Sequence, residues 1–165
     1  MKRVVALTLF ASLAGCGLTP LYQGGSAGVV ASTLSGVDVA PIEGKAGWLM
    51  SSALKDRIAA AGSPRYRLDV ELDDQITGFG VRRDDAVTRE RRTLRARYRL
   101  VEIGPGTVVL DATAGSDAGI DVVSSDYATI AAENTALERL TGVVADQIVA
   151  RVALYARRTA EPATK

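Results

Sequence analysis

The chain has 165 residues, no histidine, one cysteine and a formal net charge of +1, from 20 basic and 19 acidic side chains. Near neutrality argues against general nucleic-acid binding, which needs a large positive field. The lack of histidine removes catalysis that relies on an imidazole base and zinc sites built on imidazole. Of these chemistries only that of carboxylates remains, and we expect a protein that is not an enzyme and needs no cofactor.

The N-terminus has the pattern of a bacterial lipoprotein signal peptide. The basic pair Lys2-Arg3 precedes a short apolar run, and the segment ends in Leu13-Ala14-Gly15-Cys16, which is similar to a lipobox. The run is too short to span a bilayer, which needs about 20 apolar residues. A lone cysteine can also be a small buried apolar residue, but this position favours residues 1–15 as a cleaved signal peptide and Cys16 as the lipidated mature N-terminus.

The rest of the chain predicts one domain behind a tether. Residues 16–35 are rich in glycine and serine, which indicates a flexible linker after the lipidated cysteine. Within this linker, the apolar patch at residues 18–22 is either exposed or docks on the domain. We assign residues 36–158 to a single α+β domain, because a chain of this length supports one core, and residues 159–165 to a disordered tail.

The domain begins with a short strand and a helix. Residues 36–42 alternate between apolar and polar side chains and predict the strand. Residues 45–61 have apolar residues at helical spacing, followed by the helix-stopping Gly62 and Pro64. We expect Trp48 to pack in the core or at its rim rather than to stack on a ligand. The apolar stripe of the helix consists of Met50, Leu54, Ile58 and Ala61.

Three more strands follow, beginning at about residues 66, 87 and 108, with turns at 82–86 and 104–106. A hairpin centred near Asp84 gives paired residues whose numbers sum to about 168, and this register sets acidic residues opposite arginines. We expect a bulge or twist near Gly78 or Gly80. The predicted charge pairs are Asp69 with Arg99, Glu71 with Arg97, and Asp73 with Arg95. The inward residues of the last strand are Val108, Leu110, Ala112 and Ala114.

A long helix closes the chain, at about residues 126–156, with Tyr127 and Ile130 beginning its apolar stripe. Because this helix would be longer than the sheet it covers, we expect that one end projects or that the helix bends near Gly142. The order is then β-α-β-β-β-α. Both helices lie on one face of a four-stranded mixed sheet, which defines an α+β two-layer sandwich.

Arginines near the hairpin turn are the sharpest candidate site: Arg82, Arg83, Arg89, Arg91 and Arg92. The planar guanidinium suits bidentate contact with phosphate or carboxylate. For a membrane-tethered protein, the nearby anions are lipid headgroups and the phosphates of glycolipids. The alternative is a solvated, charged strand that resists edge aggregation.

Two carboxylate pairs, Asp73-Asp74 and Asp84-Asp85, could in principle hydrolyse a glycosidic bond. Adjacent strand residues point to opposite faces, however, and both pairs lie close to arginines. Turn and salt-bridge roles are therefore favoured over a cell-wall hydrolase that uses Asp74 or Asp85.

The stretch Cys16-Gly17-Leu18-Thr19-Pro20-Leu21-Tyr22 resembles the segment after the lipobox in the lipopolysaccharide-assembly lipoproteins of the LptE family, and Ser125-Asp126-Tyr127 resembles the start of that family's final helix. The resemblance implies an outer-membrane lipoprotein that sits inside the barrel of its partner LptD, helps it assemble and binds lipopolysaccharide. Gly17 after the cysteine is similar to outer-membrane sorting. An auxiliary lipoprotein of an ABC-type lipid transport system, bridging the envelope, is the alternative.

Overall fold

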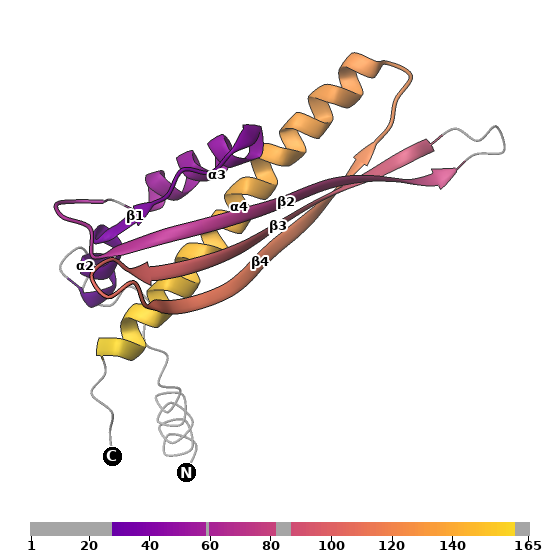
Figure 1. Ribbon diagram of the computed structural model, residues 1–165. Coiled ribbons are helices and arrows are strands. Elements are labelled where there is room, and N and C mark those ends of the chain that lie inside the picture. Colours follow the sequence, from indigo (N-terminus) through magenta and orange to yellow (C-terminus); the bar gives the residue numbers. More distant parts are fainter. Residues whose placement is uncertain (1–27, 59, 82–86, 161–165) are drawn as a thin grey trace, which may run out of the picture.

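The computed structural model describes residues 28–58, 60–81 and 87–160 and shows an α+β fold (Figure 1). The sheet has the strand order β1-β2-β3-β4, with β1 parallel to β2 and the other neighbours antiparallel. Helices α3 and α4 pack on one of its faces, as the sequence predicts. In chain order the elements are α2 (Val29–Ser35), β1 (Val37–Val39), α3 (Gly44–Arg57), β2 (Tyr66–Val81), β3 (Val87–Glu102), β4 (Val108–Asp121) and α4 (Asp126–Ala160).

The β2–β3 hairpin has the register that its charge pattern predicts. Asp69 pairs with Arg99, and the numbers of paired residues sum to 168 along the whole ladder, as far as the pair of Val81 with Val87. Of the bulge or twist expected near Gly78 or Gly80, the bulge is therefore wrong, although Gly80 has a φ of 76°, which a glycine adopts without strain. The register shifts instead between β3 and β4, at Leu100 and Val101.

The core lies between the sheet and the helices α2, α3 and α4. Alternate residues of β2 and β3 point into it, because side chains of a strand alternate between its two faces. Val108, which follows the register shift, is 48% exposed rather than inward. The buried strand residues are Tyr66, Leu68, Val70, Leu94, Ala96, Tyr98 and Leu100, and they meet helix residues that include Leu34, Met50, Leu54, Ile58, Leu137, Leu140, Val144, Ile148 and Val152.

Both ends of the predicted domain need correction. Residues 29–35, placed in the linker, form helix α2, and its residues Val30 and Leu34 are buried. These two side chains are four residues apart and share one face of the helix, which the glycines and serines around them obscure in the sequence. At the other end, α4 continues to Ala160, so Thr159 and Ala160 are helical rather than part of a tail.

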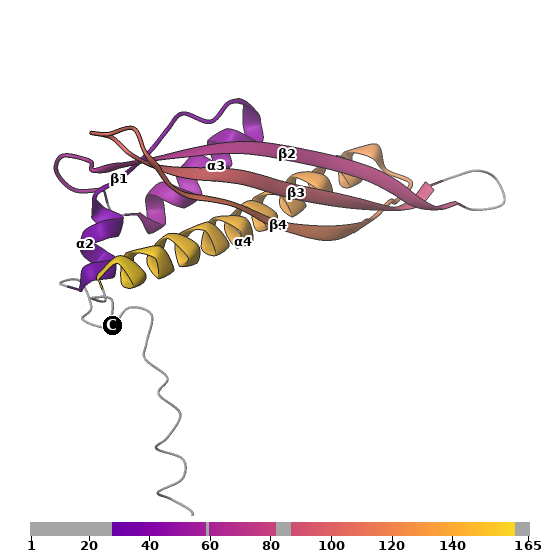
Figure 2. The ribbon, with the colours of Figure 1, turned by 60° about the horizontal axis from the view of Figure 1, so that its bottom comes forward.

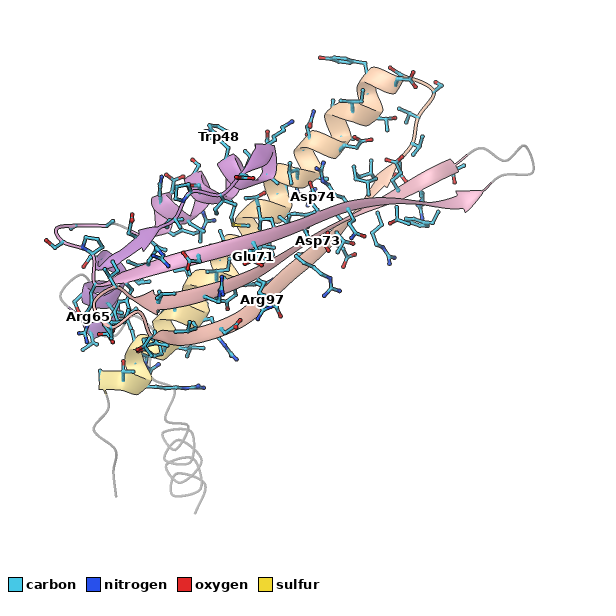
Figure 3. All side chains as sticks on the ribbon, viewed as in Figure 1. Trp48, Arg65, Glu71, Asp73, Asp74 and Arg97 are labelled. Carbon is cyan, nitrogen blue, oxygen red and sulfur yellow. The ribbon has the colours of Figure 1, made fainter. Side chains whose placement is uncertain are left out.

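Met50 and Leu54 of α3 are buried, and so is Ile58, which directly follows the last helical residue. These three residues were predicted to belong to the apolar stripe. Trp48 does not pack in the core, because it lies on the other side of the helix from Met50 and is 69% exposed (Figure 3). Ala61, expected on the buried stripe, lies beyond the helix and is exposed.

Helix α4 is a single helix with no break at Gly142. It runs beside α3, and near the start of α3 Lys45 donates a hydrogen bond to Asn134 at 2.6 Å. The first turns of α4 therefore extend beyond α3 (Figure 2). This explains why Tyr127 and Ile130, expected in the apolar stripe, are 84% and 54% exposed. No helix within residues 28–58, 60–81 and 87–160 is long and apolar enough to cross a membrane.

An ion pair joins α3 to α4 near the C-terminal end of α3. Arg57 Nε donates to Asp146 Oδ1 at 2.6 Å, and this hydrogen bond lowers the pKa of Asp146. A carboxyl whose pKa is lower in the folded state stabilises the fold above its unfolded pKa and loses this effect as the pH falls through the folded pKa.

We expect Asp146→Asn to cost at most about 1 kcal/mol at pH 7, because the carboxylate is 66% exposed and water screens the pair. The cost should shrink toward zero at about pH 2, because the carboxyl of Asp146 becomes protonated in the folded protein as well as in the unfolded chain. Urea unfolding of both proteins at the two pH values measures this difference. A cost that is the same at both pH values would contradict the assignment to the ion pair.

Candidate anion-binding face of the sheet

The sheet face opposite α3 and α4, called the outer face, carries a column of arginines on β3. Alternate residues of a strand share a face, so the odd-numbered arginines of β3 form one column. Since β3 lies between β2 and β4, this arginine column runs along the middle of the three long strands. Its members are Arg89, Arg91, Arg95, Arg97 and Arg99.

Carboxylates flank the arginine column on both sides. In the described part of the strands, the outward acidic residues are Asp38 on β1, Asp69, Glu71 and Asp73 on β2, and Asp111, Asp117 and Asp121 on β4. Together with Arg67 on β2, the described strands therefore place six arginines and seven carboxylates on the outer face. The charges on this face nearly cancel, although β3 alone is strongly basic.

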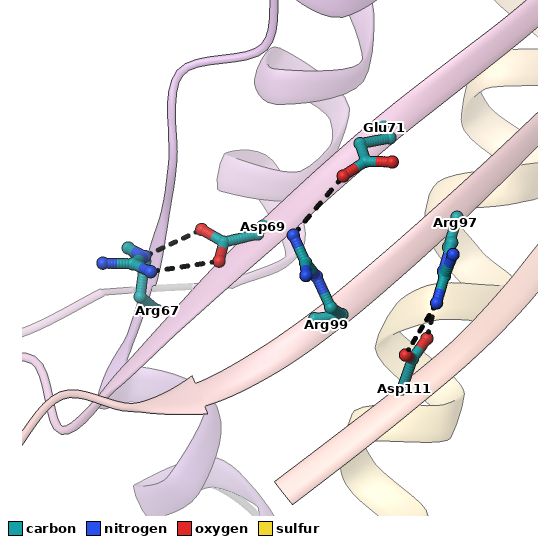
Figure 4. A network of polar contacts seen from close by, with 6 residues as sticks. All are labelled: Arg67, Asp69, Glu71, Arg97, Arg99 and Asp111. Atoms are coloured by element: carbon teal, nitrogen blue, oxygen red, sulfur yellow. Dashed lines mark hydrogen bonds and ion pairs between the residues drawn. The ribbon is translucent and has the colours of Figure 1, made fainter. Parts of the chain in front are cut away.

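Most arginines of the column form ion pairs with neighbouring strands (Figure 4). Arg97 Nη2 lies 3.1 Å from Asp111 Oδ2 on β4, and Arg99 Nη2 lies 3.4 Å from Glu71 Oε1 on β2. The hydrogen bond from Arg97 lowers the pKa of Asp111. An anionic ligand must compete with these carboxylates for the guanidinium groups.

The structure separates the predicted site residues. Arg82 and Arg83 lie outside the described residues. Arg89 and Arg91 belong to the arginine column, where Arg89 Nε lies 3.1 Å from Asp121 Oδ1 and Arg91 Nε lies 3.8 Å from Asp117 Oδ2. The guanidinium of Arg91 also lies over the ring of Phe79, 5.5 Å from its centroid.

Arg92 lies on the opposite face, toward α4, where its side chain is only 11% exposed. Its Nε and Nη2 donate to the carboxylate of Asp74 at 2.8 and 2.5 Å, and its Nη1 donates to the carbonyl oxygen of Glu133 in α4 at 2.8 Å. All three nitrogen atoms are thus occupied within the fold. Arg92 joins the sheet to α4 and does not share a face with Arg91.

Asp73 and Asp74 do not form a catalytic pair. Asp74 binds Arg92 on the side of α4, whereas Asp73 points to the outer face and accepts a hydrogen bond from Gln75 at 3.0 Å (Figure 3). Asp84 and Asp85 lie outside the described residues. Within the parts of the chain that the structure describes, no three potential metal ligands are grouped to hold an ion.

Arg95 is the member of the arginine column for which no ion pair is found within the described residues. Its neighbour on β4 is Gly115, which has no side chain, and its neighbour on β2 is Asp73. A hollow of about 540 Å³ opens here, and its lining includes Thr93, Arg95 and Thr113 as well as the carboxylates of Glu71, Asp73 and Asp117. A Cβ on Gly115 would lie 3.3 Å from Cγ of Arg95. Gly115 therefore leaves room for the aliphatic part of the Arg95 side chain.

The sequence alone did not show that Arg95 has no ion pair among the described residues. Asp73 lies opposite Arg95 as predicted, but no ion pair joins them, whereas Arg89 and Arg91, nearer the turn, pair with aspartates of β4. The missing signal was on β4, where Asp117 and Asp121 alternate with inward residues and reach the positions beside Arg91 and Arg89.

Residues 34–152 match the LptE family, described as lipopolysaccharide-assembly. No curated protein matches the chain. Among solved structures, a Caulobacter crescentus CB15 protein described as a lipoprotein has a TM-score of 0.68 and 26% identity, over 82% of this chain and 100% of that chain.

Two further structures share the fold at low identity. Rare lipoprotein B from Shewanella oneidensis has a TM-score of 0.59 and 8% identity, over 74% of this chain and 96% of that chain. A minor lipoprotein from Acinetobacter baumannii has a TM-score of 0.55 and 11% identity, over 72% and 88%. Since the family match spans more than half of its residues, the chain belongs to the LptE family of lipopolysaccharide-assembly proteins.

Proposed function

We propose that this chain is a non-enzymatic lipoprotein of the outer membrane that sits inside the β-barrel of LptD, helps that barrel assemble and binds lipopolysaccharide on its way to the cell surface. The observation that carries the proposal is the family match over residues 34–152, which includes all four strands, α3 and most of α4. A lipid on Cys16 anchors the chain, which faces the periplasm or lies in the barrel lumen.

The outer face supports contact with the phosphate groups of lipopolysaccharide. Arginine binds phosphate through two parallel hydrogen bonds, and Arg95, for which no ion pair is found within the described residues, lines a hollow. Arg89 and Arg91 contribute once a phosphate displaces their exposed carboxylate partners, a small cost for surface ion pairs. Arg82 and Arg83 remain part of the proposed site. Arg92 is left out, because Asp74 and Glu133 occupy its donors.

Arg95→Asp should weaken lipopolysaccharide binding about tenfold, because it removes a charge-assisted contact and adds a repelling charge. The matched control is Arg67→Asp, which makes the same change in charge on the same face, at an arginine that is bonded to Asp69 at 2.7 Å. Binding of purified lipopolysaccharide to the folded, full-length variants at several salt concentrations measures the effect. Equal losses in both variants would show that only overall charge matters and would reject the assignment to Arg95.

Purification of the full-length chain from membranes, with its native lipid anchor, tests whether the chain is associated with a β-barrel protein. We expect a heat-modifiable barrel protein to co-purify with the wild-type chain in mild detergent. Cys16→Ser removes the anchor and should lower the yield of the complex in the membrane fraction. Co-purification of ABC transporter subunits without a barrel would contradict the proposal and favour the auxiliary transport role.

A further inference from the structure

The edge of β2 is open over most of its length. Strand β1 pairs only with residues 66–68 of β2, while β2 continues to Val81. The amide of Tyr66 donates to Gly36 and the carbonyl of Leu68 accepts from Ala40, so these even-numbered residues direct their backbone groups toward the edge. Strand residues alternate in this direction. The next residues that face the open edge are therefore Val70, Leu72, Asp74, Ile76 and Gly78.

The opposite edge of the sheet is formed by β4, and a side chain of α4 occupies part of it. The side chain of Gln147 in α4 accepts a hydrogen bond from the amide of Gly115 at 3.2 Å and donates one to its carbonyl oxygen at 3.3 Å. Gln147 thus occupies the middle of the β4 edge in the way that a further strand would. Within the described residues, no side chain or strand does the same for β2 between Val70 and Gly78.

The side chains along β2 define what an added strand would carry. On the outer face, Glu71 and Asp73 would lie beside its outward residues, and opposite charges in neighbouring strands stabilise a sheet. On the face toward the helices, Leu72 is half-buried and Ile76 is 42% exposed. Apolar side chains of the new strand would therefore become partly buried against them. The complementary strand alternates basic and apolar residues.

Two other occupants fit poorly. A second copy of this chain would bring either Glu71 and Asp73, or the aspartates of β4, against the carboxylates of β2, and like charges in this position are destabilising. The wall of a closed barrel has no free strand edge to offer. The occupant must instead be an extended terminus or loop.

We propose that the β2 edge from Val70 to Gly78 binds an extended segment of a partner protein as a further strand, with lysine or arginine at the positions facing outward and apolar residues at those facing α3 and α4. The backbone of β2 supplies the affinity through hydrogen bonds, and the carboxylates of Glu71 and Asp73 select basic residues. The backbone edge lies on β2 and the arginine column on β3, but the two share carboxylates, since Glu71 pairs with Arg99 and both Glu71 and Asp73 line the hollow at Arg95.

The test uses the full-length chain in detergent and a synthetic nine-residue peptide, blocked at both ends, in which lysine alternates with valine. We expect the peptide to slow amide hydrogen exchange at Leu72 and Ile76. A peptide with glutamate in place of lysine should bind at least fivefold more weakly. Equal binding of the two peptides, or the lack of slowed exchange at these amides, would overturn the proposal.

A pair of proline variants tests the edge itself. Gly78→Pro removes an amide that faces the open edge of β2, where proline is tolerated, and should weaken binding of the lysine peptide at least fivefold. Gly119→Pro makes the same change on the β4 edge, at nearly the same distance from the hairpin turn, and should leave binding unchanged. Equal losses in the two variants would place the peptide elsewhere.

A charge reversal keeps the proposal testable if Gly78→Pro unfolds the domain. Asp73→Lys retains the backbone edge and should shift the preference at least fivefold toward the glutamate peptide; an unchanged preference would contradict the role of Asp73. Co-purification with a barrel is not expected to change in this variant. Failure of the strand-addition proposal can therefore be distinguished from failure of the proposed place in the barrel.

Discussion

Asp74→Ala is expected to destabilise the fold by about 2–4 kcal/mol, because it leaves the guanidinium of Arg92 without its partner in a nearly buried position. The Arg92 side chain is 11% exposed and that of Asp74 is 21% exposed, so water cannot replace the carboxylate fully. The two hydrogen bonds to Asp74 also hold Arg92 where it donates to Glu133 in α4. The substitution therefore weakens the attachment of α4 to the sheet as well as the pair itself.

The adjacent residue provides the control for Asp74→Ala. Asp73 is an aspartate in the same strand, but it points to the outer face and is exposed, so Asp73→Ala should change the free energy of unfolding by no more than about 0.5 kcal/mol. Urea denaturation of both variants at pH 7 measures the difference. In the double variant Asp74→Leu with Arg92→Met, most of the lost stability should return, since replacing both partners removes the unpaired charge. A similar effect of the two alanine variants would contradict the structural role of the Asp74–Arg92 pair.

The sequence predicted the sheet better than the helices that surround it. Alternation in β2 and β3 defines one buried face, and a slip of one residue would turn every apolar side chain to water, so a single register is possible. The charge pairs of Asp69 with Arg99 and Glu71 with Arg97 are neighbours as predicted. Within the described residues, however, no predicted pair forms an ion pair: Asp69 binds Arg67, Glu71 binds Arg99, and Arg97 turns to Asp111 on β4. Each arginine has several carboxylates within reach, and which one it contacts depends on the three-dimensional surroundings of its side chain.

The candidate site was only partly predictable for a similar reason. Arg91 and Arg92 are adjacent in the sequence, and the alternation of a strand alone separates them to opposite faces. The hidden partner of Arg92, the carbonyl oxygen of Glu133, comes from a helix distant in the chain, and no local pattern indicates it. Arg95, for which no ion pair is found within the described residues, lies beside Gly115, whose position in the sheet follows from the register of β4.

Helix α2 was missed because seven residues, about two turns, with only two buried apolar side chains carry little signal, and tertiary packing, not propensity, stabilises so short a helix. Its inclusion in the domain changes the reach of the proposed anchor. A tether of residues 17–35 could extend at most about 65 Å, whereas residues 17–28 extend at most about 40 Å. If Cys16 is lipidated as we propose, the end of the domain that holds α2 stays within that shorter distance of the membrane.

Leu34→Ala tests whether α2 is part of the core. Leu34 is 6% exposed and packs in the main core, where α2 contacts α4, so the substitution should cost about 2–4 kcal/mol through lost burial and the remaining cavity. Ser32→Ala, on the exposed side of the same helix, should cost less than about 0.5 kcal/mol. Both variants should unfold in one transition in urea. A loss as small as that of Ser32→Ala would mean that α2 is not held by the core; the tether would then include residues 29–35, and the longer reach would apply.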